Sequence, residues 1–381
     1  MSVRKTLLVI SLVAACFQAS AQDLGIIDRI VKSFFDKVSG PDPRFDSSYV
    51  TRPALPWSFS VGTTLISTGS DLKSDIKVTD YTSPNAPTIN ADLESRMRRH
   101  LHKKVGGSIG YGSLSLSGAI EVGSKNPGKN TFFSFSFRQP SYGAKIHYYR
   151  THEYVDGILD VEGASLPYSF TSDYPGMMST LTFDAYYLFN HRRFSYTAAT
   201  EGNFVQHRSA GSWMAIAKYH QGDMSLDQAD KFMLSFSNGL CRYTTRQVSL
   251  GAGYSFNYVP IHRDVSNHVS GKGFRNLTIN LSAIPMASLY NHLYTYSILR
   301  GDDSSGKSSF DGRIVPAFIV RGGISFSWDR FSLVSSTSYN SFGFNGLPSI
   351  IWEDGHRLKN DIETNGMFYD LTTSFSLIVR L

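Results

Sequence analysis

Alternation of apolar and polar residues with a period of two is the feature of this sequence that most constrains its fold. Residues 246–258 show it clearly: Val248, Leu250, Ala252, Tyr254, Phe256 and Tyr258 alternate with Ser249, Gly251, Gly253, Ser255 and Asn257. Residues 57–67, 273–284 and 367–381 carry the same pattern. A tilted strand of roughly 9 to 11 residues is long enough to cross the hydrocarbon core of a membrane. The pattern therefore favours strands with one apolar and one small or polar face.

The connections between these segments separate a membrane barrel from a soluble sandwich, whose strands also alternate. About fourteen strands are predicted from the pattern, in residues 57–67, 101–111, 113–122, 130–139, 142–152, 178–189, 192–201, 209–220, 246–258, 273–284, 287–298, 313–328, 330–341 and 367–381. Connections at one end are short, as at Gly112 and Asp329-Arg330, and those at the other end are long and polar. Residues 221–245 break this rule, and one misplaced strand pair would lower the count to about twelve.

Short turns at one end and long loops at the other are typical of outer-membrane barrels. The sequence therefore predicts an all-β fold, a transmembrane antiparallel up-and-down β-barrel of about 12–14 strands, in residues 56–381. An aromatic content of 13%, with 21 Tyr and 26 Phe, fits the aromatic girdles of such barrels. A hydrophobic content of 41% is too low for a helical membrane protein.

The N-terminal residues predict export. Residues 1–21 are interpreted as a cleaved signal peptide, with basic Arg4 and Lys5, an apolar run from Thr6 to Ala15, and the small-residue site Ala19-Ser20-Ala21. A second interpretation stays open, because Val13-Ala14-Ala15-Cys16 resembles a lipoprotein box in which Cys16 would be acylated. Residues 22–55 are expected to form a short periplasmic amphipathic helix and a linker. The helical face is formed by Leu24, Ile27, Ile30, Val31, Phe34 and Val38, before Gly40-Pro41.

Charge and cysteine content exclude two classes of protein. The formal net charge of +6 falls by two when Arg4 and Lys5 are removed, which is too weak an excess to indicate nucleic-acid binding. The chain has 2 Cys, and removal of Cys16 with the signal leaves Cys241 alone. A disulfide-stapled fold is therefore not expected.

Several segments in the middle of the chain resemble a known family. They are Phe194-Ser195-Tyr196, Gln206-His207-Arg208-Ser209-Ala210-Gly211-Ser212, Gly251-Ala252-Gly253-Tyr254-Ser255-Phe256-Asn257-Tyr258-Val259-Pro260 and Leu281-Ser282-Ala283-Ile284-Pro285-Met286. In this order they resemble an uncharacterised family of Bacteroidetes-type outer-membrane barrels, a domain-of-unknown-function family. The resemblance implies a barrel fold and a place in the cell envelope. It implies no catalytic residues.

The sequence contains no diagnostic catalytic or metal-binding motif. His147, His152, His191, His207 and His220 accompany many serines, but no Gly-x-Ser-x-Gly elbow joins them. No His-x-x-x-His or Cys pair predicts a metal, and the glycine-rich runs lack the lysine of a phosphate loop. We therefore expect no catalytic residues, no metal and no cofactor. A lipid- or lipopolysaccharide-modifying enzyme, an acyl hydrolase or acyltransferase, is kept as the alternative.

Two sets of charged residues are the candidate functional sites. Five charged residues fall on the polar phase of their strands. A charge on the lipid face would cost about 2–4 kcal/mol near the midplane, so these five are expected to face the interior. These are Arg138, Lys145, Asp184, Arg321 and Asp370. They either line a water-filled pore or cross-link a closed interior. A basic cluster, expected at the outer rim, could pair with lipopolysaccharide phosphates; it comprises Arg96, Arg98, Arg99, Lys103 and Lys104.

The sequence thus predicts a non-catalytic channel, binding or structural protein in the outer membrane of a Gram-negative bacterium. Its expected partners are outer-membrane lipid, lipopolysaccharide and, during insertion, the barrel-assembly machinery. Ligand, oligomeric state and the choice between open pore and closed interior are not determined by the sequence.

Overall fold

The structure is a computed structural model that describes residues 45–53, 55–80, 88–122, 130–161, 168–171, 176–225, 242–265, 273–296, 307–346, 349–353 and 358–381. The predicted signal peptide, the lipoprotein box at Cys16 and the amphipathic helix lie outside these residues. The described part of the chain contains no helix with the length and apolar character needed to cross a membrane.

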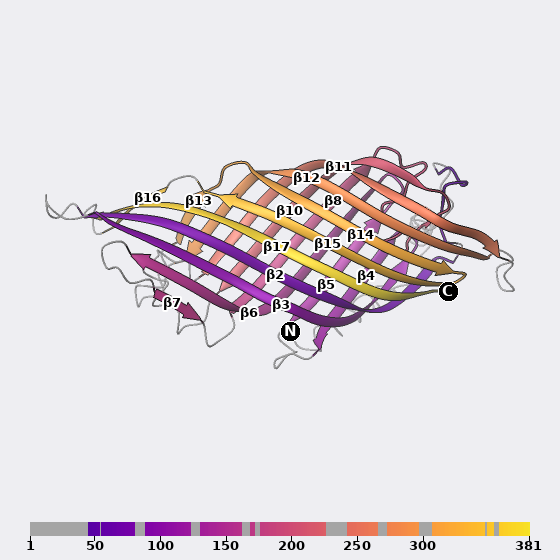
Figure 1. The fold of residues 1–381 in the computed structure, drawn as a ribbon, viewed down its shortest axis with the longest axis horizontal. Coiled ribbons are helices and arrows are strands. Elements are labelled where there is room, and N and C mark those ends of the chain that lie inside the picture. Colours follow the sequence, from indigo (N-terminus) through magenta and orange to yellow (C-terminus); the bar gives the residue numbers. More distant parts are fainter. Residues whose placement is uncertain are drawn as a thin grey trace, which may run out of the picture. The chain divides into compact units, whose positions relative to one another are not determined.

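Twelve strands form a closed antiparallel ring (Figure 1). In chain order they are β2 (Trp57–Asp80), β3 (Ile89–Tyr111), β4 (Leu114–Val122), β5 (Thr131–Arg138), β6 (Tyr142–Val161), β8 (Gly176–Leu188), β10 (Ala210–Ser225), β11 (Arg242–Val265), β12 (Gly273–Tyr296), β14 (Val315–Trp328), β15 (Phe331–Asn345) and β17 (Leu358–Arg380). Each pairs with its neighbour in this order, and β17 pairs with β2 to close the ring. Closure removes free sheet edges, as a membrane requires. The predicted up-and-down barrel is confirmed.

Smaller strands extend this ring or lie apart from it. β7 (Tyr168–Thr171), β13 (Lys307–Asp311) and β16 (Ser349–Glu353) pair with β6, β12 and β17 respectively. β1 (Val50–Thr51) and β9 (Val205–Gln206) form a separate two-stranded sheet. β2, β11 and β12 are each 24 residues long. Because roughly 9 to 11 residues cross a bilayer, these strands continue beyond it.

The outer face of the barrel is apolar because the alternation places large hydrophobic side chains there. On β14, Phe318, Val320 and Ile324 point outward and are exposed, while Ala317 and Ile319 are buried inside. Exposed aromatic residues gather near the end with the short turns: Trp57, Tyr142, Tyr187, Trp213, Tyr254, Tyr258 and Trp328. This is the aromatic girdle expected at a membrane interface. In outer-membrane barrels the short turns face the periplasm, so we call this the periplasmic end.

Two predicted strand assignments were wrong, and correcting both gives twelve strands. Residues 192–201 form turns, because Phe194 to Thr200 are buried on every side and leave no face for lipid. The segments 273–284 and 287–298 lie on one strand, β12, which passes through Pro285 with this residue on its outer face. The connection from β10 to β11 then falls at the end opposite the short turns. A long connection is expected at that end, so its length agrees with the pattern of short turns at one end and long loops at the other.

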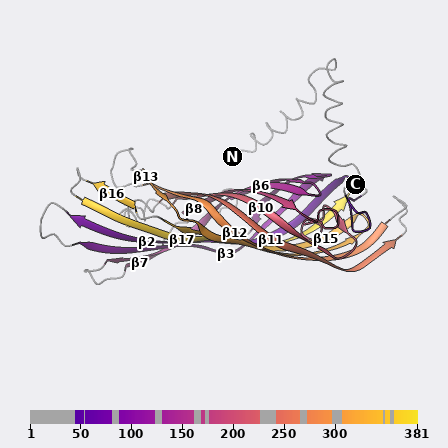
Figure 2. The same cartoon turned by 90° about the horizontal axis from the view of Figure 1, so that it is seen from above.

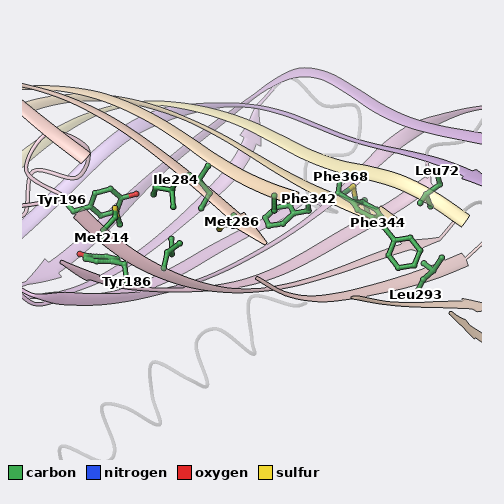
Figure 3. Close-up of a cluster of buried hydrophobic side chains, with 14 of the residues drawn as sticks. Leu72, Tyr186, Tyr196, Met214, Ile284, Met286, Leu293, Phe342, Phe344 and Phe368 are labelled. Carbon is green, nitrogen blue, oxygen red and sulfur yellow. The ribbon is translucent and has the colours of Figure 1, made fainter. Parts of the chain in front are cut away.

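Buried apolar side chains lie inside the barrel along much of its length. A buried apolar cluster runs from Tyr196 and Met214, through Ile284 and Met286, to Leu293 and the aromatic rings of β15 and β17 (Figure 3). Figure 2 shows the same strands seen from above, in two facing layers. The inward phase was predicted to be small and polar, but its outer half also carries large apolar side chains, among them the buried Phe342, Phe344 and Phe368.

Candidate functional site

Residues 190–209, which connect β8 to β10, enter the periplasmic end of the barrel and are called the plug. Phe194, Ala199 and Gln206 are fully buried. The plug contacts strands far apart in the ring, since Ser325 Oγ on β14 donates to the Ala198 carbonyl at 3.1 Å and Arg138 on β5 binds Glu201. The order of the strands places β5 and β14 six steps apart in the ring of twelve. The plug therefore reaches across the interior.

Polar groups of the plug are satisfied by its own side chains and by the barrel wall. Asn257 Nδ2 donates to the Ser195 carbonyl at 2.7 Å, and the Ser195 amide donates to Gln206 Oε1 at 3.0 Å. Gln206 Nε2 donates to two plug carbonyls, those of Arg193 and Arg208. A buried loop costs free energy unless its backbone is paired in this way. The segment is consequently built to reside inside the barrel.

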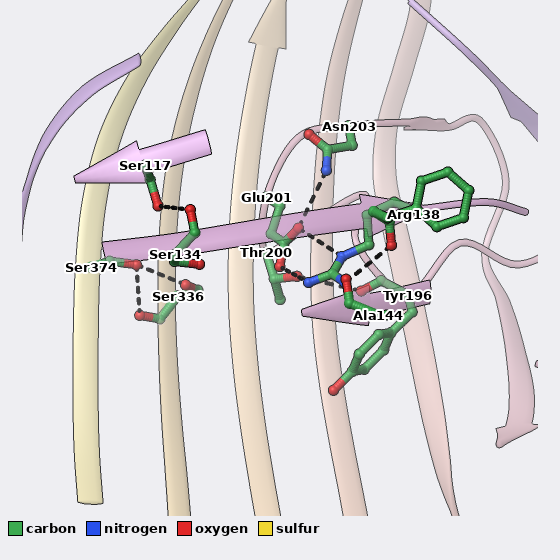
Figure 4. Close-up of polar contacts among 11 residues, drawn as sticks. Ser117, Ser134, Arg138, Ala144, Tyr196, Thr200, Glu201, Asn203, Ser336 and Ser374 are labelled. Atoms are coloured by element: carbon green, nitrogen blue, oxygen red, sulfur yellow. Dashed lines mark hydrogen bonds and ion pairs between the residues drawn. The ribbon is translucent and has the colours of Figure 1, made fainter. Parts of the chain in front are cut away.

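An ion pair joins the plug to the wall at the periplasmic end of β5 (Figure 4). Arg138 Nε and Nη2 each donate to one carboxylate oxygen of Glu201, both at 3.1 Å, and Nη1 donates to the Ala144 carbonyl at 2.7 Å. The Arg138 side chain is only 3% exposed. Burial raises the pKa of a carboxyl, but the Arg138 guanidinium outweighs burial and lowers the pKa of Glu201 to about 2. Glu201 is thus a carboxylate at neutral pH.

A cavity of about 120 Å³ lies beside this ion pair, between the plug and the aromatic side chains of the outer half. Its wall combines charged, amide and hydroxyl groups with Phe132, Tyr149, Tyr186, Tyr196 and three isoleucines. The polar members are Arg138, Lys145, His147, Asp184, Lys218, Arg321, Ser338, Asn340, Asp370 and Thr372. A space of this size has room for several water molecules or a small solute.

Lys218 and Asn340 organise one side of the cavity. Lys218 Nζ lies 3.4 Å from Asp184 Oδ1 and donates to Asn340 Oδ1 at 3.0 Å. Asn340 Nδ2 in turn donates to both carboxylate oxygens of Asp370, each at 2.7 Å. The Lys218 ammonium also lies 4.7 Å from the centre of the Phe342 ring. This series of contacts connects β8, β10, β15 and β17 across the interior.

The structure places all five predicted inward charges, Arg138, Lys145, Asp184, Arg321 and Asp370, on the wall of this one cavity. A role in lining a conducting pore stays a prediction. Among the described residues, no cluster of three or more His, Cys, Asp or Glu is arranged to hold a metal ion.

The predicted basic rim is only partly described. Lys103 is exposed on β3, and the side chains of Arg96, Arg98 and Arg99 are outside the described set. Lys104 differs from the expectation, since it is 1% exposed and points into the barrel. It lies opposite Glu121 in the register of β3 and β4, near the rings of Phe132 and Tyr149. Adjacent residues of a strand face opposite sides, so Lys103 and Lys104 cannot share one surface.

The sequence did not predict the cavity residues Lys218 and Asn340 or the plug residue Glu201, which binds Arg138. Lys218 falls on the buried phase of β10 with Met214 and Ile216, so its phase was a readable signal. Asn340 lies on a serine-rich strand where neither phase is distinctive. Glu201 was assigned to a strand that does not exist, and its partner Arg138 lies 63 residues away. No local pattern indicates a contact of that separation.

A closed antiparallel ring with an apolar outer band, an aromatic girdle and a set of charges inside the barrel defines an outer-membrane β-barrel protein. Residues 46–346 match the family described as a domain of unknown function, DUF4421. The chain belongs to this family.

No curated protein matches the chain. Solved structures that are similar to it include the beta domain of the Bordetella autotransporter BrkA, at 10% identity and a TM-score of 0.27, covering 83% of this chain and 99% of that one. The Escherichia coli outer membrane protease OmpT has 10% identity and a TM-score of 0.25, covering 85% and 97%. The P. putida toluene transporter TodX has 9% identity and a TM-score of 0.22, covering 84% and 90%. Similarity this low says nothing about activity.

Proposed function

We propose that this protein is a non-catalytic outer-membrane barrel with a closed interior, which holds a small solute inside instead of acting as an open diffusion channel. One observation carries the proposal: the charged cavity is flanked on both sides by packed residues. The plug fills the periplasmic side, and buried aromatic side chains, including Phe342, Phe344 and Phe368, fill the outer side. Buried packing of this kind supports an interior without a continuous water column.

Planar-bilayer recording tests the closed interior. Purified full-length protein that shows a heat-modifiable, folded form on a gel should insert without steady single-channel steps across a range of voltages. An outer-membrane channel of known conductance, reconstituted in parallel, controls for insertion. Steady steps at all voltages from the folded wild-type protein would show an open pore and overturn the proposal.

The alternative proposal, an acyl hydrolase or acyltransferase acting on lipid or lipopolysaccharide, is tested separately. Such an enzyme needs a nucleophile activated by a base that a third group orients. In the structure His207 Nε2 lies 2.7 Å from Thr51 Oγ1, and its other ring nitrogen faces His262. Release or transfer of acyl chains from lipopolysaccharide by the purified protein, lost in Thr51→Val and His207→Gln, would support the enzyme and contradict the non-catalytic proposal.

The envelope setting is also proposed. We expect a cleaved signal in residues 1–21 and a Gram-negative host of Bacteroidetes type. We also expect the barrel to contact lipid and lipopolysaccharide and to be inserted by the barrel-assembly machinery. The apolar outer band supports the lipid contact. Mass spectrometry of the mature N-terminus would distinguish cleavage after Ala21 from acylation at Cys16.

A further inference from the structure

The charges around the cavity do not balance. Four cationic side chains line it, Arg138, Lys145, Lys218 and Arg321, against the carboxylates of Asp184 and Asp370. Glu201 adds a third carboxylate from the plug, bound by Arg138. One positive charge is left over even when every carboxylate is counted. An interior charge in a membrane protein is costly and calls for a counter-charge.

The existing pairs show where the excess lies. Arg138 is engaged by Glu201, and Lys218 by Asp184 and Asn340. Asp184 stands opposite both Lys145 and Lys218 in the strand register, so one carboxylate serves two ammonium groups. The Asn340 amide holds both oxygens of Asp370. The anions are therefore already engaged by other groups.

Lys145 and Arg321 are the cations that remain. Within the described residues, neither makes a hydrogen bond or ion pair, and both keep partly exposed side chains that border the cavity. The Arg321 guanidinium lies 5.1 Å from the centre of the Tyr196 ring, which fixes its plane without neutralising its charge. The Lys145 ammonium is attracted by the Glu201 and Asp184 carboxylates, but Lys145 and Arg321 still repel each other. An anion between them would relieve this repulsion.

The chemistry of the wall indicates what kind of anion fits. A guanidinium forms two parallel hydrogen bonds with a carboxylate or a phosphate, and an ammonium adds a third donor. Ser338 and Thr372 supply hydroxyls on the same wall, while Phe132, Tyr149 and Ile319 exclude bulk water. The volume of about 120 Å³ is enough for a small organic acid or a phosphate.

We propose that the cavity is a binding site for a small oxyanion, a carboxylate or a phosphate, held by Lys145 and Arg321. This inference deepens the proposed function and rests on it in one respect, that the interior is a closed compartment. A closed compartment keeps the anion away from competing water and salt. The bound solute is thus expected to be acidic.

Calorimetric titration of the folded full-length protein in detergent at constant salt tests the site. The probes are inorganic phosphate and succinate, with glycerol as a neutral probe and methylammonium as a cationic one. We expect saturable binding of succinate or phosphate and none of the other two. Preference for succinate or for phosphate shows whether the site binds a carboxylate or a phosphate group. Absence of saturable binding of both acids would overturn the proposal.

A pair of variants with equal charge makes the test specific. Lys145→Gln/Arg321→Gln should weaken binding about tenfold or more for each lost charge-assisted contact. Lys103→Gln/Arg313→Gln removes the same charge from exposed positions and should bind like wild type. Equal binding by the two double variants would overturn the site. Heat-modifiability confirms folding, and the single variants Lys145→Gln and Arg321→Gln replace the double variant if it does not fold.

The two proposals fail in different ways. Steady wild-type conductance together with acid binding that depends on Lys145 and Arg321 would overturn the closed interior and support the anion site. A non-conducting barrel without acid binding would overturn the anion site and support the closed interior.

Discussion

The two halves of the barrel interior are filled in different ways. In the periplasmic half the filling is the plug, a separate stretch of chain held by side-chain contacts such as Arg138 with Glu201 and Asn257 with the Ser195 carbonyl. In the outer half the filling consists of side chains of the strands themselves, including Leu293, Phe342 and Phe368. The plug can leave without unpairing any strand of the ring, whereas the outer filling can move only with the wall. Access to the cavity is therefore expected from the periplasmic side.

The largest effect is expected from breaking the ion pair that holds the plug. Arg138→Met leaves the Glu201 carboxylate buried without its guanidinium, which costs about 3–5 kcal/mol unless the plug moves out. We expect a lower urea midpoint and faster hydrogen exchange in residues 194–206.

The plug also provides an exposed pair as a control for this prediction. Arg193 Nε lies 3.6 Å from Asp46 Oδ2, with side chains 58% and 37% exposed. Arg193→Met should change stability by at most about 1 kcal/mol. In Arg138→Met/Glu201→Met both charges are gone, and most of the stability should return. If residues 194–206 exchange in Arg138→Met at the same rate as in the wild-type protein, the ion pair does not hold the plug.

Truncation in the outer half should affect the wall and spare the plug. Leu293 is fully buried on β12, and Leu293→Ala should cost about 2–5 kcal/mol through lost transfer energy and the cavity left behind. Leu281 on the same strand is 66% exposed on the lipid face, where lipid fills the gap, so Leu281→Ala should cost less. If Leu293→Ala increased hydrogen exchange, relative to wild type, more in the plug than in β12, the separation of the two halves would be contradicted.

The two halves also differ in how far the sequence predicts them. The lipid face follows from period-two alternation, because the membrane demands apolar residues at every outward position of Val248 to Tyr258. The same demand puts Arg138 and Arg321 on the inward phase. Inward residues meet no uniform solvent, so Phe342 and Phe344 alternate like lipid-facing residues although they face the interior. The plug was mistaken for a strand because its partners, such as Ser325 and Asn257, lie far away in the chain.

Two adjacent glycines on β14 sharpen the test of plug seating with a smaller change. A Cβ on Gly323 would lie 2.6 Å from Thr200 Cγ2 and 2.9 Å from the Ala199 carbonyl oxygen, whereas one on Gly322 would meet nothing closer than 3.9 Å. Gly323→Ala should therefore push on the plug and cost about 1–3 kcal/mol. Gly322→Ala is the matched control and should leave the urea midpoint nearly unchanged. Equal midpoints for the two variants would show that the plug does not pack on β14 as described.

The smallest effect is expected from acid, which acts on the same ion pair without changing the sequence. The pKa of Glu201 is lowered to about 2 in the folded barrel from an ordinary 4.5. A carboxyl with a depressed folded pKa stabilises the fold fully above its unfolded value and loses that contribution as pH falls toward the folded value. After correction for the pH dependence of the intrinsic amide exchange rate, exchange of the plug should therefore stay constant between pH 7 and 5 and increase between pH 4.5 and 2. Because acid also titrates other carboxylates, the comparison is with Arg138→Met/Glu201→Met, in which the acid-dependent increase in residues 194–206 should be smaller. An increase of the same size in this double variant would assign the acid response to groups other than Glu201, and the plug would then be held by its packing and its neutral hydrogen bonds alone.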